Sequence, residues 1–218
     1  MPDFSALCPL LSEGEVRLIA APGPDKPTSR AAVLARRRSL PPPVRAAADE
    51  AIRRVLTSVV AAIAPATVCA HAPMSGEPGG PDLPRSLAAV AGIRLLLPVL
   101  RTDNDLDWAR YPADLAPGRY GLLEPTGPRL GVAAVAHADL VVAPGLAMAA
   151  DGVRLGRGGG SYDRSLTRVP ASALVLVALY DGEVFATLPH QPHDQFADAA
   201  ATPSGLHRAA STGRKRPA

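Results

Sequence analysis

Cysteine and aromatic residues are scarce in this chain. Only two of its 218 residues are cysteines, and aromatic residues make up 4% of the sequence. Cys8 lies near the start and Cys69 in an apolar stretch, so the pair supplies neither a disulfide framework nor a cysteine-based metal site. We therefore expect a protein of a reducing compartment, the cytoplasm.

Long hydrophobic runs and a targeting segment are also missing. Pro65 and polar flanks interrupt the longest apolar stretches, so the run of about eighteen apolar residues that a membrane span needs is absent. Pro2, Asp3 and the Glu13-Gly14-Glu15 stretch stand where a signal peptide has a basic lead and an apolar region. These features predict a cytoplasmic protein that does not span a membrane.

The sequence also lacks a strong excess of one charge. The formal net charge is only +3, and much of it lies in Arg36-Arg37-Arg38 and in Arg214-Lys215-Arg216. A charge so small and so local does not indicate nucleic acid as a partner. A weak contact of the basic end with RNA or an acidic surface stays open beside the simpler interpretation, a solvated tail.

The chain does have enough apolar sequence for one substantial domain, because 47% of its residues are hydrophobic. Residues 1–25 predict an irregular extension, residues 26–205 one α/β domain, and residues 206–218 a basic, disordered tail. Helical and strand patterns alternate, which predicts a three-layer α/β/α domain with a mainly parallel central sheet. The expected helices span residues 26–40, 44–64, 83–91 and a stretch after 162, and the expected strands span 67–71, 93–99, 120–123, 140–143 and 173–179.

The most informative segment, residues 154–164, holds four glycines, three arginines and one acid in RLGRGGGSYDR. Glycines let backbone N–H groups approach an anion, and arginines neutralise its charge. The segment follows a predicted strand and so lies at the carboxyl edge of a sheet, where α/β proteins bind ligands. It matches neither a P-loop nor Gly-x-Gly-x-x-Gly, so it predicts a polyphosphate site of another kind. A flexible surface turn is the alternative.

With Pro144-Gly145 upstream, this segment resembles the ATP loop of the 5-formyltetrahydrofolate cyclo-ligase family. Three further matches follow the family's order: Lys26-Pro-Thr-Ser-Arg30, Met74-Ser-Gly-Glu77 and His193-Asp194-Gln-Phe-Ala-Asp198. The resemblance covers about residues 26 to 205.

The chain departs from the family pattern at three places. Ser161 stands where an aromatic residue is usual, Ser29 where an aliphatic one is, and Pro78-Gly79-Gly80 replaces an acid followed by threonine. These changes bear on the pterin contacts and the first helix more than on the ATP loop.

The resemblance implies ATP-dependent cyclisation of 5-formyltetrahydrofolate to 5,10-methenyltetrahydrofolate, with ADP and phosphate released. The implied partners are 5-formyltetrahydrofolate and ATP, with Mg²⁺ as cofactor, and we expect a monomer. Catalytic roles fall on Lys26 and Arg157. ATP-binding roles fall on Lys26, Arg30, Arg154, Gly156, Arg157, Gly158, Gly159, Gly160, Ser161 and Tyr162. Substrate-binding roles fall on Glu77, Arg157, Gly158, Gly159, Gly160 and Ser161, and metal-binding roles on Asp163 and Asp194.

The chemistry of these residue types agrees with such roles. Lys26 and Arg30 are four residues apart on a predicted helix and so share a face. A carboxylate such as Glu77 accepts two parallel hydrogen bonds from an amino-pyrimidinone. Mg²⁺ favours carboxylate oxygens together with phosphates and water, so two acids suffice.

Two other function classes stay open. One is a catalytically inactive protein of the same fold that binds a folate or a nucleotide. The other is a dinucleotide-dependent oxidoreductase, which the glycine spacing disfavours.

Overall fold

The computed structural model describes residues 5–10 and 20–210, and its centre is a seven-stranded sheet. The strand order is β12-β11-β9-β6-β1-β2-β3. These strands are β1 (Thr67–Cys69), β2 (Arg94–Leu100), β3 (Leu106–Tyr111), β6 (Leu140–Pro144), β9 (Leu174–Ala178), β11 (Ala199–Thr202) and β12 (Gly205–Arg208). The five inner strands run parallel, whereas β3 and β12 run antiparallel to their neighbours at the two edges.

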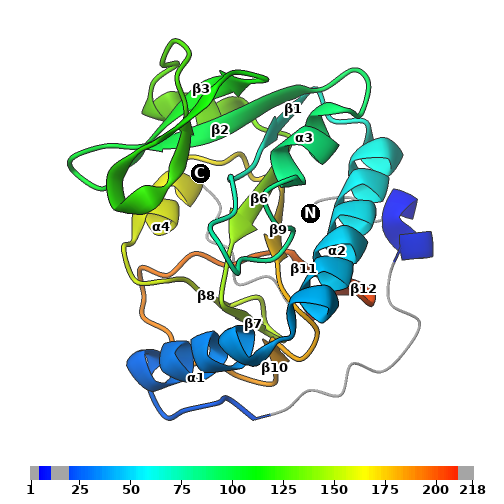
Figure 1. Ribbon diagram of the computed structural model, residues 1–218, viewed down its shortest axis with the longest axis vertical. Helices are drawn as coiled ribbons and strands as arrows, with labels where there is room; N and C mark the ends of the chain where they lie inside the picture. The colour runs from blue at the N-terminus through cyan, green and yellow to red at the C-terminus, as the bar shows by residue number, and fades with distance from the viewer. Residues whose placement is uncertain (1–4, 11–19, 211–218) are drawn as a thin grey trace.

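Helices cover both faces of this sheet (Figure 1). One face carries η1 (Ser5–Leu10), α2 (Pro42–Ile63) and α3 (Leu83–Ala88), and the other carries η3 (Val132–His137) and α4 (Ser161–Leu166). Successive strand residues alternate between the two cores: Val68 packs with α2, whereas Cys69 packs with α4. The predicted three-layer domain with a mainly parallel sheet is confirmed.

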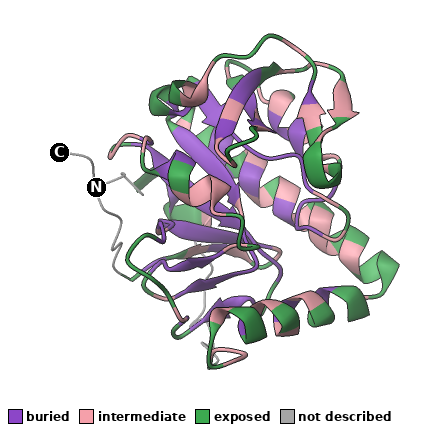
Figure 2. Cartoon of the chain, turned by 90° about the vertical axis from the view of Figure 1, so that its left-hand side faces the viewer, coloured by how far each residue is buried: buried purple, intermediate pink, exposed green. Residues whose placement is uncertain are grey.

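A third apolar cluster joins α1 (Lys26–Ser39) to a small sheet at the carboxyl edge of the large one. That sheet consists of β7 (Ala147–Ala149), β8 (Arg154–Leu155) and β10 (Val184–Phe185). Figure 2 shows α1 with buried residues on its inner side and exposed residues on its outer side. The helix begins at Lys26 because the Asp25 side chain accepts a hydrogen bond from Thr28 N at 2.8 Å.

A buried ion pair fixes α1 in this place. Arg37 Nε and Nη2 donate to the two carboxylate oxygens of Glu183 at 2.8 and 2.7 Å, and Nη2 also donates to Gly145 O at 2.9 Å. Glu183 in turn accepts a hydrogen bond from Tyr180 N at 2.8 Å. The position of α1 therefore depends on one guanidinium that links it to the turn after β6.

Two sequence-based predictions about local structure are wrong. Residues 120–123 form no strand of the large sheet, because Tyr120 and Gly121 have φ of 56° and 74° and turn the chain. The segment is instead η2 (Arg119–Gly121) followed by β5 (Leu123–Pro125), which pairs only with β4 (Leu115–Pro117). The disordered tail was expected from residue 206, yet β12 lies there because Leu206 is buried in the core.

The predicted N-terminal extension lies partly outside the described residues. Of residues 1–25, the structure describes 5–10 and 20–25, and Leu7 is buried in the core beside α2. The last part of the basic tail, residues 211–218, also lies outside. Within the described ranges, none of the helices combines the length and hydrophobicity of a membrane span.

The Arg37–Glu183 pair gives a prediction about stability. Glu183→Ala leaves a guanidinium buried without its carboxylate, so we expect a loss of about 3 kcal/mol or more in the free energy of unfolding. Urea denaturation measures it. Asp82→Ala, which removes the partner of the exposed Arg85, is the control and should leave the midpoint almost unchanged. A Glu183→Ala protein as stable as that control would contradict the anchoring role.

Candidate active site

Two cavities meet at the carboxyl edge of the sheet. The first, of about 470 Å³, has largely apolar walls and is lined by Glu77, Leu106, Tyr120 and Leu122 among others; we call it the hydrophobic cavity. The second, of about 560 Å³, is lined by Lys26, Arg30, Asp163 and Asp194 among others; we call it the charged cavity. Residues 156–160, the glycine loop, contribute to the walls of both.

The glycine loop connects β8 to α4 and needs its glycines. Gly158 and Gly160 have φ of 106° and 72°, which side-chain-bearing residues rarely adopt. A Cβ atom on Gly156 would lie 2.9 Å from Arg154 Nη1, which is too close for a real contact. The loop therefore presents bare backbone to both cavities.

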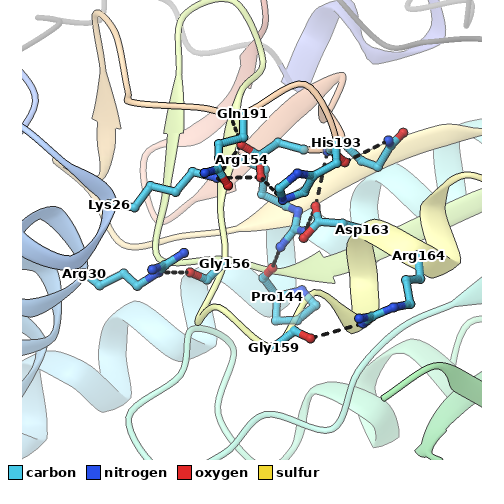
Figure 3. Close-up of polar contacts among 12 residues, drawn as sticks. Lys26, Arg30, Pro144, Arg154, Gly156, Gly159, Asp163, Arg164, Gln191 and His193 are labelled. Atoms are coloured by element: carbon cyan, nitrogen blue, oxygen red, sulfur yellow. Dashed lines mark hydrogen bonds and ion pairs between the residues drawn. The ribbon is translucent and has the colours of Figure 1, made fainter. Parts of the chain in front are cut away.

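Arg154 holds this loop from behind (Figure 3). Its buried guanidinium donates to Pro144 O at the end of β6 at 3.1 Å and to Asp163 Oδ1 on α4 at 2.8 Å. The same guanidinium lies 6.0 Å from the centre of the Tyr162 ring. Arg154 thus joins the end of β6 to α4, the helix that follows the loop.

In the charged cavity, Lys26 of α1 reaches the segment before β11, where Figure 3 labels Gln191 and His193, and pairs there with Asp194. Lys26 Nζ lies 2.7 and 2.5 Å from the two carboxylate oxygens of Asp194. Burial raises the pKa of Asp194, but Lys26 and the Gln191 backbone N–H outweigh it and hold the pKa below its usual value. Asp194 is therefore ionised at neutral pH. Arg30 Nε donates to Gly156 O at 2.9 Å, which ties α1 to the glycine loop.

Asp163 and Asp194 both line the charged cavity, and each has a basic partner, Arg154 and Lys26 respectively. The part of the chain that the structure describes contains no cluster of three or more His, Cys, Asp or Glu side chains that would hold a metal ion. A metal at this place would therefore take most of its ligands from a bound molecule and from water.

The hydrophobic cavity has a buried acid in its wall. Glu77 lies in the loop after β1, and its two carboxylate oxygens accept hydrogen bonds from Arg157 Nε at 2.7 Å and Met74 N at 2.9 Å. Burial by itself raises the pKa of Glu77. Attraction to positive charge and these hydrogen bonds lower the pKa by more than burial raises it, so the net pKa lies below its usual value. The acid is a buried carboxylate that faces a pocket.

The Pro78-Gly79-Gly80 departure is accommodated by α2. Gly79 N donates to Asp49 Oδ1 at 3.0 Å, and Arg53 Nη1 donates to Gly79 O at 2.8 Å. A Cβ atom on Gly80 would meet the Asp49 carboxylate at 3.0 Å. Two side chains of α2 therefore hold the loop that carries Glu77.

The structure brings the residues expected to form the site together at this edge. Lys26, Arg30, Asp163 and Asp194 line the charged cavity, and Glu77, Arg157, Ser161 and Tyr162 line the hydrophobic one. Arg154 and most of the glycine loop line both. The Tyr162 hydroxyl is buried, so this residue offers the cavity its ring and backbone.

Sequence reasoning missed several lining residues. His71 follows β1, and Asn104 belongs to the hairpin between β2 and β3, where no motif marks either. Tyr120 was considered part of a strand, although the Gly118 and Gly121 around it are a signal for a turn. Glu124 also lines the cavity and accepts a hydrogen bond from Leu100 N at 2.9 Å.

Fold and site together define an α/β protein whose glycine loop forms part of the walls of two neighbouring cavities. Comparison with known proteins agrees with the resemblance that the sequence motifs indicated. The model of the 5-formyltetrahydrofolate cyclo-ligase family matches residues 22–203. A 5-formyltetrahydrofolate cyclo-ligase of Mycolicibacterium smegmatis is 39% identical over 180 residues, which cover 80% of this chain and 91% of that protein. The mitochondrial 5-formyltetrahydrofolate cyclo-ligase of Arabidopsis thaliana is 38% identical over 78 residues, 31% of this chain and 28% of that one.

Solved structures share the fold. The 5,10-methenyltetrahydrofolate synthetase of Aquifex aeolicus superposes with a TM-score of 0.71 at 28% identity, over 88% of this chain and 96% of that one. The Mycoplasma pneumoniae 5,10-methenyltetrahydrofolate synthetase gives 0.66 at 18% identity, over 82% and 99%, and supports the fold alone. The chain belongs to the 5-formyltetrahydrofolate cyclo-ligase family, as its motifs predicted.

The contacts of Arg154 give a prediction about stability. Arg154→Met removes a buried guanidinium, so Pro144 O loses this donor and Asp163 loses its charged partner, and we expect a loss of about 3 kcal/mol in unfolding free energy. Arg168→Met is the matched control, since it removes a more exposed pair with Asp105 and should cost about 1 kcal/mol or less. Chemical denaturation of both variants measures the difference. Equal losses would mean that Arg154 does not hold the loop.

Proposed function

We propose that this chain closes the ring of 5-formyltetrahydrofolate to give 5,10-methenyltetrahydrofolate, with ATP converted to ADP and phosphate. Membership of an ATP-dependent ligase family supports the reaction. The observation that carries the proposal is the glycine loop, which forms part of the wall of both cavities. Two substrates bound on its two sides would meet at the loop.

ATP occupies the charged cavity in this proposal. Its triphosphate accepts hydrogen bonds from the glycine-loop N–H groups, and Lys26 and Arg30 neutralise its negative charge. Lys26 is held by Asp194 in the structure, so it has to exchange that carboxylate for phosphate when ATP binds. The proposed ATP-binding residues are Lys26, Arg30, Arg154, Gly156, Arg157, Gly158, Gly159, Gly160, Ser161 and Tyr162.

Mg²⁺ fits the two acids of this cavity. Asp163 and Asp194 supply carboxylate oxygens beside the proposed phosphates, and the exchange that frees Lys26 also frees Asp194 for a cation. Bound Mg²⁺ would neutralise charge on the phosphates. We propose these two residues as its protein ligands.

The folate occupies the hydrophobic cavity. Glu77 accepts two hydrogen bonds from the amino-pyrimidinone of the pterin, and the apolar walls pack against the ring. Arg157, which donates to Glu77 at 2.7 Å, lies on the glycine loop and can contact either substrate. The proposed substrate-binding residues are Glu77, Arg157, Gly158, Gly159, Gly160 and Ser161.

The chemistry requires position and charge rather than a protein nucleophile. The formyl oxygen forms a bond to the γ-phosphorus as the bond to the β-phosphate oxygen breaks, which releases ADP. N10 then attacks the activated formyl carbon, the C–O bond breaks with phosphate as leaving group, and the N10 proton passes to solvent. Lys26, Arg157 and the loop N–H groups neutralise the charge that moves during transfer.

Three broader features belong to the same proposal. We propose a cytoplasmic monomer with a single catalytic domain that runs from residue 26 to the end of β12 at Arg208. The cysteines agree with a reducing compartment, because neither Cys8 nor Cys69 forms a disulfide bond.

The reaction is tested by mixing the purified chain with 5-formyltetrahydrofolate, ATP and Mg²⁺ and following the near-ultraviolet absorbance of the methenyl product. Product that requires both folate and ATP supports the proposal. Folate or ATP binding without product would instead favour a catalytically inactive binding protein, and Ser161→Tyr would then be the first variant to test for restored activity.

Lys26 gives a prediction about turnover. Lys26→Ala should lower kcat/KM by about 100-fold or more, since it removes a charge that stabilises the transferring phosphoryl group and leaves Asp194 to repel it. Steady-state kinetics measure the change. Arg85→Ala, which removes an exposed cation on α3, should be unaffected. Turnover unchanged in Lys26→Ala would refute the phosphate role.

Asp163 gives a prediction about the metal. Asp163→Asn should raise the Mg²⁺ concentration for half-maximal activity by about tenfold, because one proposed oxygen ligand loses its charge. Asp105→Asn is a matched control, since this acid also pairs with an arginine but lies outside the charged cavity. A Mg²⁺ titration that does not differ between the two variants would remove Asp163 from the metal site.

A further inference from the structure

The arginines around the hydrophobic cavity fall into two groups. Four of them have a carboxylate partner: Arg101 with Asp103, Arg154 with Asp163, Arg157 with Glu77 and Arg168 with Asp105. Arg119 and Arg164 form no ion pair with any residue in the described ranges 5–10 and 20–210, and their side chains donate hydrogen bonds to uncharged oxygens. Two cations near the cavity therefore keep an uncompensated charge.

Arg119 lies beside the open mouth of the cavity. Its Nη1 donates to Arg101 O at 2.6 Å, and its guanidinium carbon lies 5.2 Å from the centre of the Tyr120 ring. Tyr120 lines the cavity and is 73% exposed, so it belongs to the mouth and not to the interior. Its φ of 56° is a strained conformation for tyrosine, as is found at ligand-binding positions.

Arg164 reaches the same mouth from α4. Its Nη1 donates to Gly159 O at 3.2 Å and to Asn104 O at 3.4 Å, and both of these residues line the hydrophobic cavity. Figure 3 shows its guanidinium directed to Gly159, with Lys26 at the opposite side of the view. Arg164 therefore lies apart from the lysine that we assign to phosphate.

One short turn links the two arginines. Arg119 and Arg164 both donate to backbone oxygens of residues 101–104, in the hairpin between β2 and β3. The acids of that hairpin are already paired, because Asp103 accepts from Arg101 and Asp105 from Arg168. The turn thus carries two guanidiniums along the rim without an acid that would neutralise them.

We infer that Arg119 and Arg164 bind the carboxylates of the glutamate tail of the folate, an inference that rests on the proposed function. In the proposed function the buried Glu77 fixes the pterin. The rest of the folate then has to extend through the mouth of the cavity, where Tyr120 is exposed. The tail ends in two carboxylates, and guanidiniums bind carboxylates in bidentate geometry. Neither arginine has to break an ion pair to do so.

The test compares three substrates that differ only in the tail: 5-formyltetrahydropteroate, which lacks glutamate, and the monoglutamate and triglutamate of 5-formyltetrahydrofolate. Arg119→Gln and Arg164→Gln should each raise KM for the monoglutamate about 3-fold, and the double variant about 10-fold. KM for the triglutamate should rise at least as much. KM for the pteroate compound and for ATP should not change.

Arg85→Gln is the matched control, because it removes an exposed guanidinium of α3 that lines neither cavity. Repeating the assay at high salt should reduce the preference of the unaltered chain for substrates with a tail, since salt screens exposed charge pairs.

Two results would overturn the inference. An equal rise in KM for all three folates would mean that the arginines shape the cavity without binding the tail. A rise in KM for ATP would mean that they bind phosphate instead. Absence of product from every folate with the unaltered chain would be a failure of the proposed function itself, which the same assay distinguishes.

Discussion

The site depends on one buried guanidinium behind the glycine loop. Arg154 donates to Pro144 O at 3.1 Å and to Asp163 Oδ1 at 2.8 Å, so it joins the end of a central strand to the first turn of α4. The loop between these points cannot move far without breaking a buried charge pair. Because the loop stays in place, its backbone contributes to the walls of both cavities, and two substrates can be presented to each other.

A second buried guanidinium places the helix that faces the loop. Arg37, in the last turn of α1, ties the helix to Glu183 and to Gly145 O, while the first turn lies beside the glycine loop. Lys26 and Arg30 project from that turn toward Asp194 and Gly156. The ion pair between Lys26 and Asp194 holds a lysine and a carboxylate close together. A triphosphate can replace Asp194 as the anionic partner of Lys26, and a cation can replace Lys26 as the positive partner of Asp194. The exchange therefore preserves the charge balance of the cavity.

Much of the fold and part of the site follow from the sequence. The expected helices over 26–40 and 44–64 correspond to α1 and α2, and the strand over 140–143 to β6, because these segments have long, regular apolar patterns. β3 and β12 were missed, since an edge strand with polar residues such as Asp107 or His207 has no such pattern. The family motifs identified the loop, but the partners of Arg154 and Lys26 come from distant parts of the chain and no local pattern predicts them. The roles of the individual site residues stay predictions.

The central claim is that the glycine loop brings the formyl oxygen of the folate into contact with the γ-phosphate of ATP. The most direct test uses 5-formyltetrahydrofolate labelled with ¹⁸O in the formyl group and analyses the inorganic phosphate by mass spectrometry. Our account predicts that the labelled oxygen appears in the phosphate, one atom for each methenyl product formed. Phosphate without label, with the label released to water, would show that the two substrates do not react directly across the loop.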